Sequence, residues 1–358
     1  MTERELFLAV MNYGSFDRMP VYHWTCWPEL LEVWAEQGVP KDAVEQARHF
    51  GVFPLLRRPP VKIQLLPGFD EEVLEETDEY RVLRDSSGVV MKDWKDRSCI
   101  PQYLEHTLKD RATWEEHFKP RLQPSADRLP ESVWTFVDEY RDRDVPVAIS
   151  CGSMVGWTRN WAGVEGLAYM AADDPDLIGE IADTIATVVI STIEPVVAMM
   201  RPKPEIAWFW EDICCKSGPL VSPRVFERYC VPAYRRITDM LRRYGVNLAL
   251  VDSDGVIDAL AALWLEAGVN VMFPVEIGVW DADPAAFRKA YGKDLRIFGG
   301  IDKRVLCQGR EAIDAEIKKR LPLMKEGGFV PLPDHLITPG VSVDDYRYYL
   351  DSIASLRF

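Results

Sequence analysis

One pattern, repeated along most of the chain, constrains the fold more than any other feature. A short apolar run rich in β-branched and aromatic residues ends in a polar or charged residue, and a longer amphipathic stretch follows it. This alternation is typical of strand and helix units built on a parallel sheet. Seven such runs predict strands over residues 19–23, 145–150, 205–210, 247–251, 270–275, 295–298 and 328–332. The pattern does not place an eighth strand.

The stretches between these runs predict helices over residues 175–200, 222–244, 256–267, 311–326 and 343–356. Local signals agree with these boundaries. Ser222 and Pro223 form an N-cap followed by proline at the first helical position, and Gly268 is a fitting C-cap. Strands and helices together predict an α/β fold, a (β/α)8 TIM barrel.

Residues 1–144 are less regular than the rest. Amphipathic helical patterning starts after Trp27, and residues 80–94 predict a β-hairpin that turns at Ser86-Ser87-Gly88. No linker rich in proline, glycine and serine separates this region from the remainder. We therefore expect one domain over residues 1–358, in which residues 1–144 add N-terminal helices and a hairpin lid to the barrel.

Composition excludes several classes of partner. The chain has 42 basic and 57 acidic residues, and this net charge of −15 argues against binding to nucleic acid or to anionic membranes. No run approaches ~18 consecutive apolar residues, so no membrane span is expected. The charged N-terminus and the irregular cysteine spacing predict a cytoplasmic protein with reduced thiols. A small molecule is the expected partner, and the sequence does not decide whether the chain forms a homodimer.

Polar residues gather at the ends of the predicted strands. In a parallel barrel these ends converge on one mouth, which is where catalytic residues are found. Carboxylates dominate there and would repel one another unless protons, a cation or a basic group offset their charge, and a divalent metal is the simplest counter-charge. The residues brought to the mouth are His23, Cys151, Glu211, Asp212, Asp252, Asp254, Glu276, Asp302, Asp334 and His335.

The sharpest motif is the sequence Asp252-Ser253-Asp254-Gly255. Side chains two residues apart on an extended strand end point to the same side, so Asp252 and Asp254 can reach one ion. With His335 from a later strand and Glu211 as a fourth ligand, they predict a metal site for zinc, manganese or iron. The same motif occurs in ordinary turns and helix caps, so a purely structural role stays open.

Three segments resemble the uroporphyrinogen decarboxylase superfamily. They are residues 210–223 (WEDICCKSGPLVSP), 298–306 (FGGIDKRVL) and 334–346 (DHLITPGVSVDDY), and the resemblance is strongest from residue 145 onward. It implies the TIM-barrel fold. One branch of the superfamily decarboxylates a tetrapyrrole without a cofactor, and the other contains corrinoid- and zinc-dependent methyltransferases.

One departure from the family patterns argues against the decarboxylase branch, and a second changes the metal ligands of the methyltransferase branch. Residues 25–29 (TCWPE) stand where the decarboxylases carry Arg-Gln-Ala-Gly-Arg, and they offer no arginine for substrate carboxylates. Asp252 and Asp254 stand where the methyltransferases carry His-x-Cys, and His335 stands near their late cysteine. Oxygen and nitrogen ligands make a harder metal site, which suits an oxygen substrate or a folate-type acceptor. The resemblance therefore implies methyl exchange between an aryl methyl ether-like substrate and a corrinoid protein or folate.

This hypothesis assigns roles to further residues. The metal, zinc in the first instance, would polarise an ether oxygen, and a methyl-corrinoid would be carried by a partner protein, because the chain has no evident corrinoid-binding motif. The candidate catalytic residues are Asp212, Glu276 and His23. The candidate substrate-binding residues are Trp24, Trp210, Cys151, Arg159 and Lys303.

Two alternatives remain. The first is a cofactor-free decarboxylase of a small acid or tetrapyrrole, in which cations such as Arg159, Lys216 and Lys303 neutralise the carboxylate and no metal is bound. The second is a binding protein that kept the barrel and lost the chemistry, in which case replacing Asp252 or His335 leaves function unchanged. The acidic strand ends argue against the second, because such groups are costly to keep at a mouth with no ligand.

Overall fold

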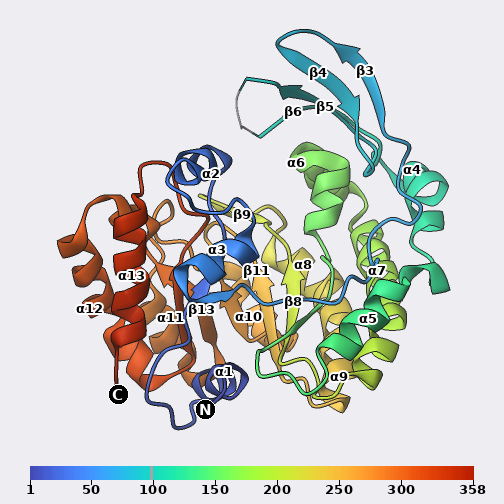
Figure 1. Ribbon diagram of the computed structural model, residues 1–358. Coiled ribbons are helices and arrows are strands. Elements are labelled where there is room, and N and C mark those ends of the chain that lie inside the picture. The colour runs from blue at the N-terminus through green and yellow to red at the C-terminus, as the bar shows by residue number, and fades with distance from the viewer. Residues whose placement is uncertain (97–99) are drawn as a thin grey trace.

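The computed structural model describes residues 1–96 and 100–358. Parallel strands lie at its centre, and helices surround them (Figure 1). Six strands form one hydrogen-bonded sheet in the spatial order β14-β13-β12-β11-β8-β7. Their bounds are β7 Ala148–Ser150, β8 Ile206–Trp210, β11 Leu248–Asp252, β12 Val271–Phe273, β13 Arg296–Ile301 and β14 Phe329–Pro333.

Two short strands complete the barrel among the described residues. β1 Tyr22–His23 pairs in parallel with β2 Phe53–Pro54. Beyond β2, Arg57 bridges Val147, and beyond β1, Cys26 bridges Ile337, so two seams of the barrel are held by isolated bridges rather than by ladders. The predicted TIM barrel is confirmed, and each of the seven predicted strands overlaps an observed one. β2, which contains Pro54, is the strand that the apolar pattern did not place.

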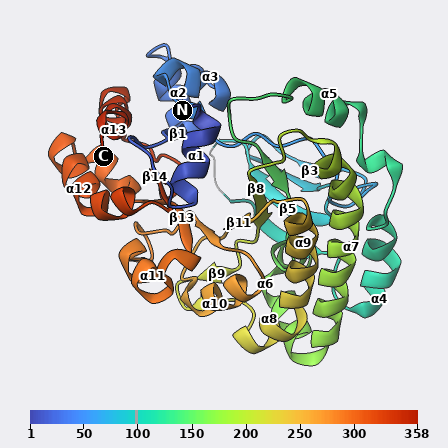
Figure 2. The same cartoon turned by 90° about the horizontal axis from the view of Figure 1, so that it is seen from below.

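The predicted helices are also confirmed, and Figure 2 shows them around the barrel from below. The predicted helix over 222–244 is in fact two helices, because Pro232 lacks the N–H that would continue the first one. The helices that follow the strands are α6 Gly156–Asp173, α7 Pro175–Met199, α8 Pro223–Tyr229, α9 Val231–Arg243, α10 Asp258–Glu266, α11 Pro284–Tyr291, α12 Arg310–Glu326 and α13 Val343–Ser355.

Helix α7 is long and apolar enough to cross a membrane by length and composition. In the fold it packs against α5 Glu131–Glu139 and against α6, α8 and α9. Its side chains from Leu177 to Val197 include a continuous buried face. Packing inside the outer layer of the barrel therefore accounts for the apolar composition of this helix.

The N-terminal region adds helices and a second sheet. α1 Glu3–Met11 precedes β1, whereas α2 Pro28–Ala35 and α3 Ala43–Phe50 lie between β1 and β2. The predicted hairpin is confirmed as β4 Tyr80–Arg84 and β5 Val89–Trp94. It forms the centre of a four-stranded antiparallel sheet with β3 Glu72–Glu76 and β6 Gln102–His106 at its edges. This sheet projects above the barrel beside α6 (Figure 1), and α4 Arg111–Thr113 follows it.

Candidate active site

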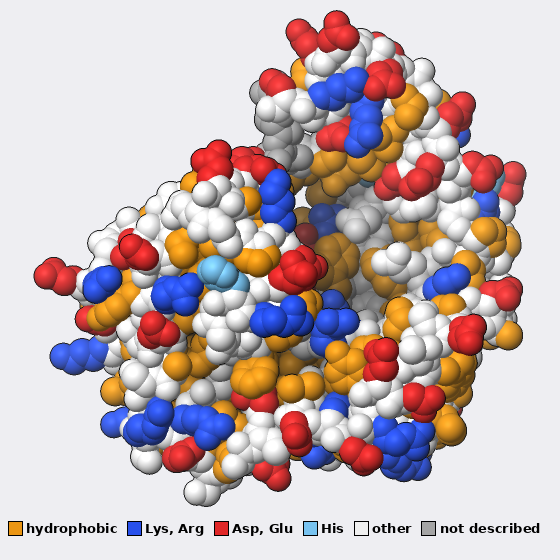
Figure 3. All heavy atoms as spheres, in the orientation of Figure 1, with side chains coloured by type: hydrophobic (Ala, Val, Ile, Leu, Met, Phe, Trp, Pro, Cys, Tyr) orange, Lys and Arg blue, Asp and Glu red, His pale blue; other side chains and the backbone are white. Residues whose placement is uncertain are grey.

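A cavity of about 770 Å³ opens at the ends of β7 and β8. Ser86 and Ser87, in the turn between β4 and β5, also line it, so the projecting sheet forms part of its wall. Figure 3 shows a deep hollow between this sheet and the barrel, with hydrophobic side chains along it. The cavity therefore lies at the mouth that the sequence predicted, beneath a lid built from the predicted hairpin.

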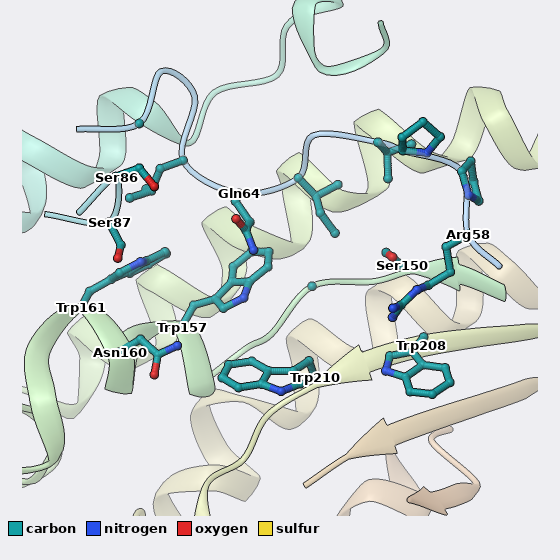
Figure 4. A pocket seen from close by; sticks show the side chains of 17 residues that line it. Arg58, Gln64, Ser86, Ser87, Ser150, Trp157, Asn160, Trp161, Trp208 and Trp210 are labelled. Atoms are coloured by element: carbon teal, nitrogen blue, oxygen red, sulfur yellow. The ribbon is translucent and has the colours of Figure 1, made fainter. Parts of the chain in front are cut away.

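Four tryptophans dominate the wall of this cavity (Figure 4). Trp157 and Trp161 are four residues apart on α6 and therefore share one helix face, with ring centroids 6.2 Å apart. Trp208 and Trp210 are two residues apart on β8 and share one strand face. Trp210 was a predicted substrate-binding residue. We call this space the tryptophan cavity.

Arg58 brings positive charge into the tryptophan cavity. Its guanidinium carbon lies 4.9 Å from the centroid of the Trp208 ring, and the side chain points toward that ring in Figure 4. Burial lowers the pKa of Arg58, and the carboxylate of Asp252 opposes this shift. Sequence analysis missed Arg58. The available signal was a pair of arginines directly before the rigid Pro59-Pro60 turn.

Asp252 ends β11, and Asp254 follows in the next turn. Gly255 has a φ of +85°, and a Cβ there would lie 2.5 Å from backbone atoms of Cys214, so the turn accepts only glycine. Burial raises the pKa of Asp252 well above its ordinary range, and the charge of Asp254 raises it further, whereas Arg58 lowers it. Asp252 is therefore disposed to hold a proton.

Asp254 and His335 are brought together from two strand ends. The distance between His335 Nε2 and Asp254 Oδ2 is 3.2 Å, and both side chains stay partly exposed. The ring of His335 lies near two tryptophans, with centroids 6.0 Å from Trp24 and 6.5 Å from Trp27. Trp24, a predicted substrate-binding residue, therefore supports this pair at the mouth of the barrel.

The predicted metal site requires three ligands around one ion. Among residues 1–96 and 100–358, no group of three or more His, Cys, Asp and Glu side chains is arranged to hold a metal. Asp254 and His335 contact each other, whereas Asp252 interacts with Arg58. The donor set thus does not fit a preformed three-ligand zinc centre. The metal stays a prediction, and we assign no chemical step to it.

Glu211, the predicted fourth ligand, has a different role in the structure. The side chain is fully buried, and burial raises its pKa. Its acceptor positions are taken up within the fold, so it fastens the loop after β7 to the end of β8. The donors are the backbone N–H groups of Met154, Val155 and Gly156 and the hydroxyls of Ser153 and Tyr234.

Asp212 and Arg159 form an ion pair, with Arg159 Nη2 2.7 Å from Asp212 Oδ2. Asp212 adopts a left-handed backbone conformation with a φ of +49°, which is uncommon for a non-glycine residue and turns the chain sharply after β8. Arg159 also lies 5.8 Å from the centroid of the Trp210 ring. The predicted catalytic carboxylate and the predicted substrate cation therefore largely neutralise each other.

Glu276 and Lys303 form a second pair beside a cavity of about 530 Å³. Lys303 Nζ lies 3.1 Å from Glu276 Oε1, and the indole N–H of Trp280 donates to the other oxygen. Burial raises the pKa of Glu276, as does the charge of Asp254, and Lys303 opposes both. His335 lines the same cavity, so this opening reaches the Asp254 and His335 pair.

His23 and Cys151 lie fully buried in the core, and neither lines any of the three cavities of about 770, 530 and 330 Å³. A neutral His23 satisfies both ring nitrogens, since Nε2 lies 2.7 Å from Gln46 Oε1 and Nδ1 lies 2.8 Å from the Tyr346 hydroxyl. Burial lowers the pKa of His23 to about 4 and raises that of Cys151. Both predicted roles are therefore corrected to packing and hydrogen bonding within the barrel.

Comparison with known proteins identifies the class of this barrel. The family model for uroporphyrinogen decarboxylase (URO-D) matches residues 93–356. The chain therefore belongs to the uroporphyrinogen decarboxylase family, whose members are enzymes.

Individual relatives are distant. A uroporphyrinogen decarboxylase from Picosynechococcus sp. is 24% identical over 56% of this chain and 53% of its own length. One from Myxococcus xanthus is 26% identical over 38% of this chain and 37% of its own length. The chain thus matches about half or less of the length of these relatives. A methyltransferase from Methanosarcina mazei shares the fold, with a TM-score of 0.63 and 15% identity over 99% of this chain and 98% of that one.

Proposed function

We propose that this protein is a methyltransferase that takes a methyl group from a small aromatic methyl ether bearing a carboxylate and passes it to a corrinoid protein or a folate. The observation that carries this proposal is the tryptophan cavity, in which Arg58 lies over Trp208 near the strand end that bears Asp252 and Asp254. The shared fold with a methyltransferase from Methanosarcina mazei supports the reaction class.

The lining of the cavity favours a flat ring with one anionic group. Indole faces stack on aromatic rings and exclude water from them. Arginine binds a carboxylate through paired N–H donors. Among the described residues that line the cavity, only Arg58 is basic. A tetrapyrrole with several carboxylates would require several cations, so the lining matches a smaller aromatic acid better.

Methyl transfer from an ether breaks the bond between the methyl carbon and oxygen, and the electron pair stays on the oxygen. The oxygen then needs a proton to leave as a neutral phenol. His335, whose Nε2 lies 3.2 Å from Asp254 Oδ2 at the mouth, is the residue that would supply this proton. Arg58 would hold the carboxylate, and the tryptophans would orient the ring and keep water away from it.

A corrinoid or a folate supplies the nucleophilic atom that accepts the methyl carbon. The cavity of about 530 Å³ is lined by His335, a member of the proposed proton-donor pair. Two of its charged residues, Glu276 and Lys303, pair with each other, and Glu29 adds a further carboxylate to its wall. We propose that the acceptor approaches from this side.

A cofactor-free decarboxylase is the second candidate, and one observation favours it. Arg58 interacts with Asp252, whose pKa is raised well above its ordinary range. An aromatic acid held by Arg58 would lose carbon dioxide, the electron pair would stay on the ring carbon, and Asp252 would give that carbon a proton. The curated relatives named uroporphyrinogen decarboxylase are in keeping with this reaction class.

Product analysis separates the two reactions. The protein is incubated with 4-methoxybenzoate that carries one isotope in the methyl group and another in the carboxyl group, together with reduced corrinoid as the acceptor. Methyl transfer releases 4-hydroxybenzoate and places the methyl label on the corrinoid. Decarboxylation releases labelled carbon dioxide and leaves the ether intact, which would overturn the first proposal.

A further inference from the structure

A second cavity, of about 330 Å³, lies beside β1 and β2, whose residues Tyr22, Phe53 and Pro54 line it. It lies between α3, the segment around β2 and the chain that enters β7, and it shares no lining residue with the tryptophan cavity. We call it the side cavity. The residues that line it are Tyr22, Val44, Arg48, Val52, Phe53, Pro54, Arg57, Tyr140, Val145 and Pro146.

The side cavity contains two arginines and no acidic lining residue among the described residues. Arg48 and Arg57 are exposed, and neither guanidinium has an ion pair or a hydrogen bond with any residue of 1–96 or 100–358. Arg143 offers a contrast, because it is buried and pairs with Glu205 at 2.7 Å. Basic side chains also gather beside α3 on the face shown in Figure 3. Two unpaired cations in one hollow of a protein with a net charge of −15 favour an anionic ligand.

The remaining lining of the side cavity is apolar and partly aromatic. Phe53 and Tyr140 offer ring surface, and Pro54 and Pro146 offer rigid apolar walls. Ligand pockets of a few hundred Å³ with such walls and a few polar groups are typical for small organic molecules. The ligand should therefore combine an anionic head with an apolar group.

Arg57 and Arg58 connect the two cavities through the backbone. The segment is extended at Arg57, which pairs in parallel with Val147 and accepts a hydrogen bond of 2.9 Å from the N–H of Ala148. Consecutive side chains of an extended segment point to opposite sides. Arg57 accordingly lines the side cavity, and Arg58 lines the tryptophan cavity.

We propose that the side cavity binds a small phosphate monoester with an apolar or aromatic group, held by Arg48 and Arg57, and that its occupancy alters ligand binding at Arg58. Two guanidinium groups match the several oxygens of a phosphate dianion. The binding part is independent of the function proposed above. The link to Arg58 rests on that function, because it requires an aromatic carboxylate in the tryptophan cavity.

Calorimetric titration of the full chain tests the binding part, with phenyl phosphate, inorganic phosphate and phthalate as probes. We expect phenyl phosphate to bind most tightly and Arg48→Gln and Arg57→Gln each to weaken it by about 10-fold or more, the cost of a lost charged hydrogen bond. Arg224→Gln, an exposed arginine on α8, is the matched control and should have no effect. Equal binding by all variants, no binding of phenyl phosphate, or tighter binding of phthalate or inorganic phosphate would overturn the proposal.

The link to Arg58 is tested by the dissociation constant of 4-methoxybenzoate with and without saturating phenyl phosphate. Coupling between sites commonly changes affinity by about 5-fold or more, and we expect such a change in the wild type and its loss in Arg57→Gln. An unchanged constant would overturn the link. Failure of 4-methoxybenzoate to bind at all would contradict the proposed function instead. The calorimetric result for phenyl phosphate in the side cavity would remain valid in that case.

Discussion

His335 and Asp254 come from the ends of two different strands of the barrel, and Nε2 of the first lies 3.2 Å from Oδ2 of the second. The sequence predicted both residues as ligands of one metal. In the structure they are partners of each other, and the rings of Trp24 and Trp27 pack against the imidazole. In the proposed methyl transfer, this pair would act as the proton donor at the mouth.

Replacing the imidazole tests this role. In His335→Gln the proton donor is lost, and we expect the rate of 4-methoxybenzoate demethylation to fall by about 10²- to 10⁴-fold, the usual contribution of general acid catalysis. Because the pair is partly exposed, the free energy of unfolding should change by less than about 1 kcal/mol. His49→Gln is the control, since His49 is an exposed histidine outside the mouth. Equal rates for His335→Gln and the control would contradict the assignment.

Arg58 should control affinity for the carboxylate of the substrate. Loss of a charged hydrogen bond in Arg58→Gln is expected to weaken binding of 4-methoxybenzoate by about 10- to 100-fold. Quenching of tryptophan fluorescence measures this, because four indoles line the cavity. Anisole lacks the carboxylate and should bind both proteins alike. Arg159→Gln should have a smaller effect, because Asp212 already neutralises that cation.

Glu3 should make stability depend on pH. Burial raises the pKa of Glu3 from 4.5 to about 7, and Tyr22 and Arg18 oppose this. The folded protein therefore keeps a proton that the unfolded chain loses above pH 4.5. The resulting stabilisation, about 3 kcal/mol at full extent, is present below pH 4.5 and is lost as the pH rises to 7.

Urea unfolding across this range checks the prediction. Glu3→Gln stays neutral at every pH. As the pH rises from 5 to 8, the free energy of unfolding of the variant should therefore increase, relative to that of the wild type, by up to about 3 kcal/mol. Parallel stability curves would show that Glu3 titrates in the folded protein as it does in the unfolded chain.

A metal measurement decides whether the ligand prediction or the acid pair is right. Because Asp254 and His335 pair with each other and Asp252 interacts with Arg58, we expect activity to persist after treatment with a chelator. Elemental analysis of the purified protein accompanies the assay. About one zinc, manganese or iron per chain, lost in Asp254→Ala and in His335→Ala, would instead establish the metal site.

The barrel was largely predictable from sequence because each strand carries its own local signal, an apolar run with a polar end. The segment around β2 also carries an apolar run, residues 52–56 before Arg57, but Pro54 within that run disfavours a strand. β3 and β6 lacked the signal, since they are exposed edge strands with no buried face. The location of the site at the strand ends followed from the fold class.

The roles of single residues were harder to predict, because they depend on partners far away in the chain. The sequence predicted Glu211 as a metal ligand, but in the structure its carboxylate accepts hydrogen bonds from the loop after β7. In the sequence Arg58 belongs to a loop, and only the structure shows that its guanidinium lies over the Trp208 ring. His23 stands at a strand end, as a catalytic residue would, but Gln46 and Tyr346 satisfy it within the core.

The most direct test compares Asp254→Asn with Asp252→Asn in the demethylation of 4-methoxybenzoate with reduced corrinoid. If the proposed methyl transfer uses the pair of His335 and Asp254, the rate should fall by about 10²-fold or more in Asp254→Asn and by clearly less in Asp252→Asn. Release of carbon dioxide that depends on Asp252 and is unaffected by Asp254→Asn would contradict methyl transfer and establish the decarboxylase.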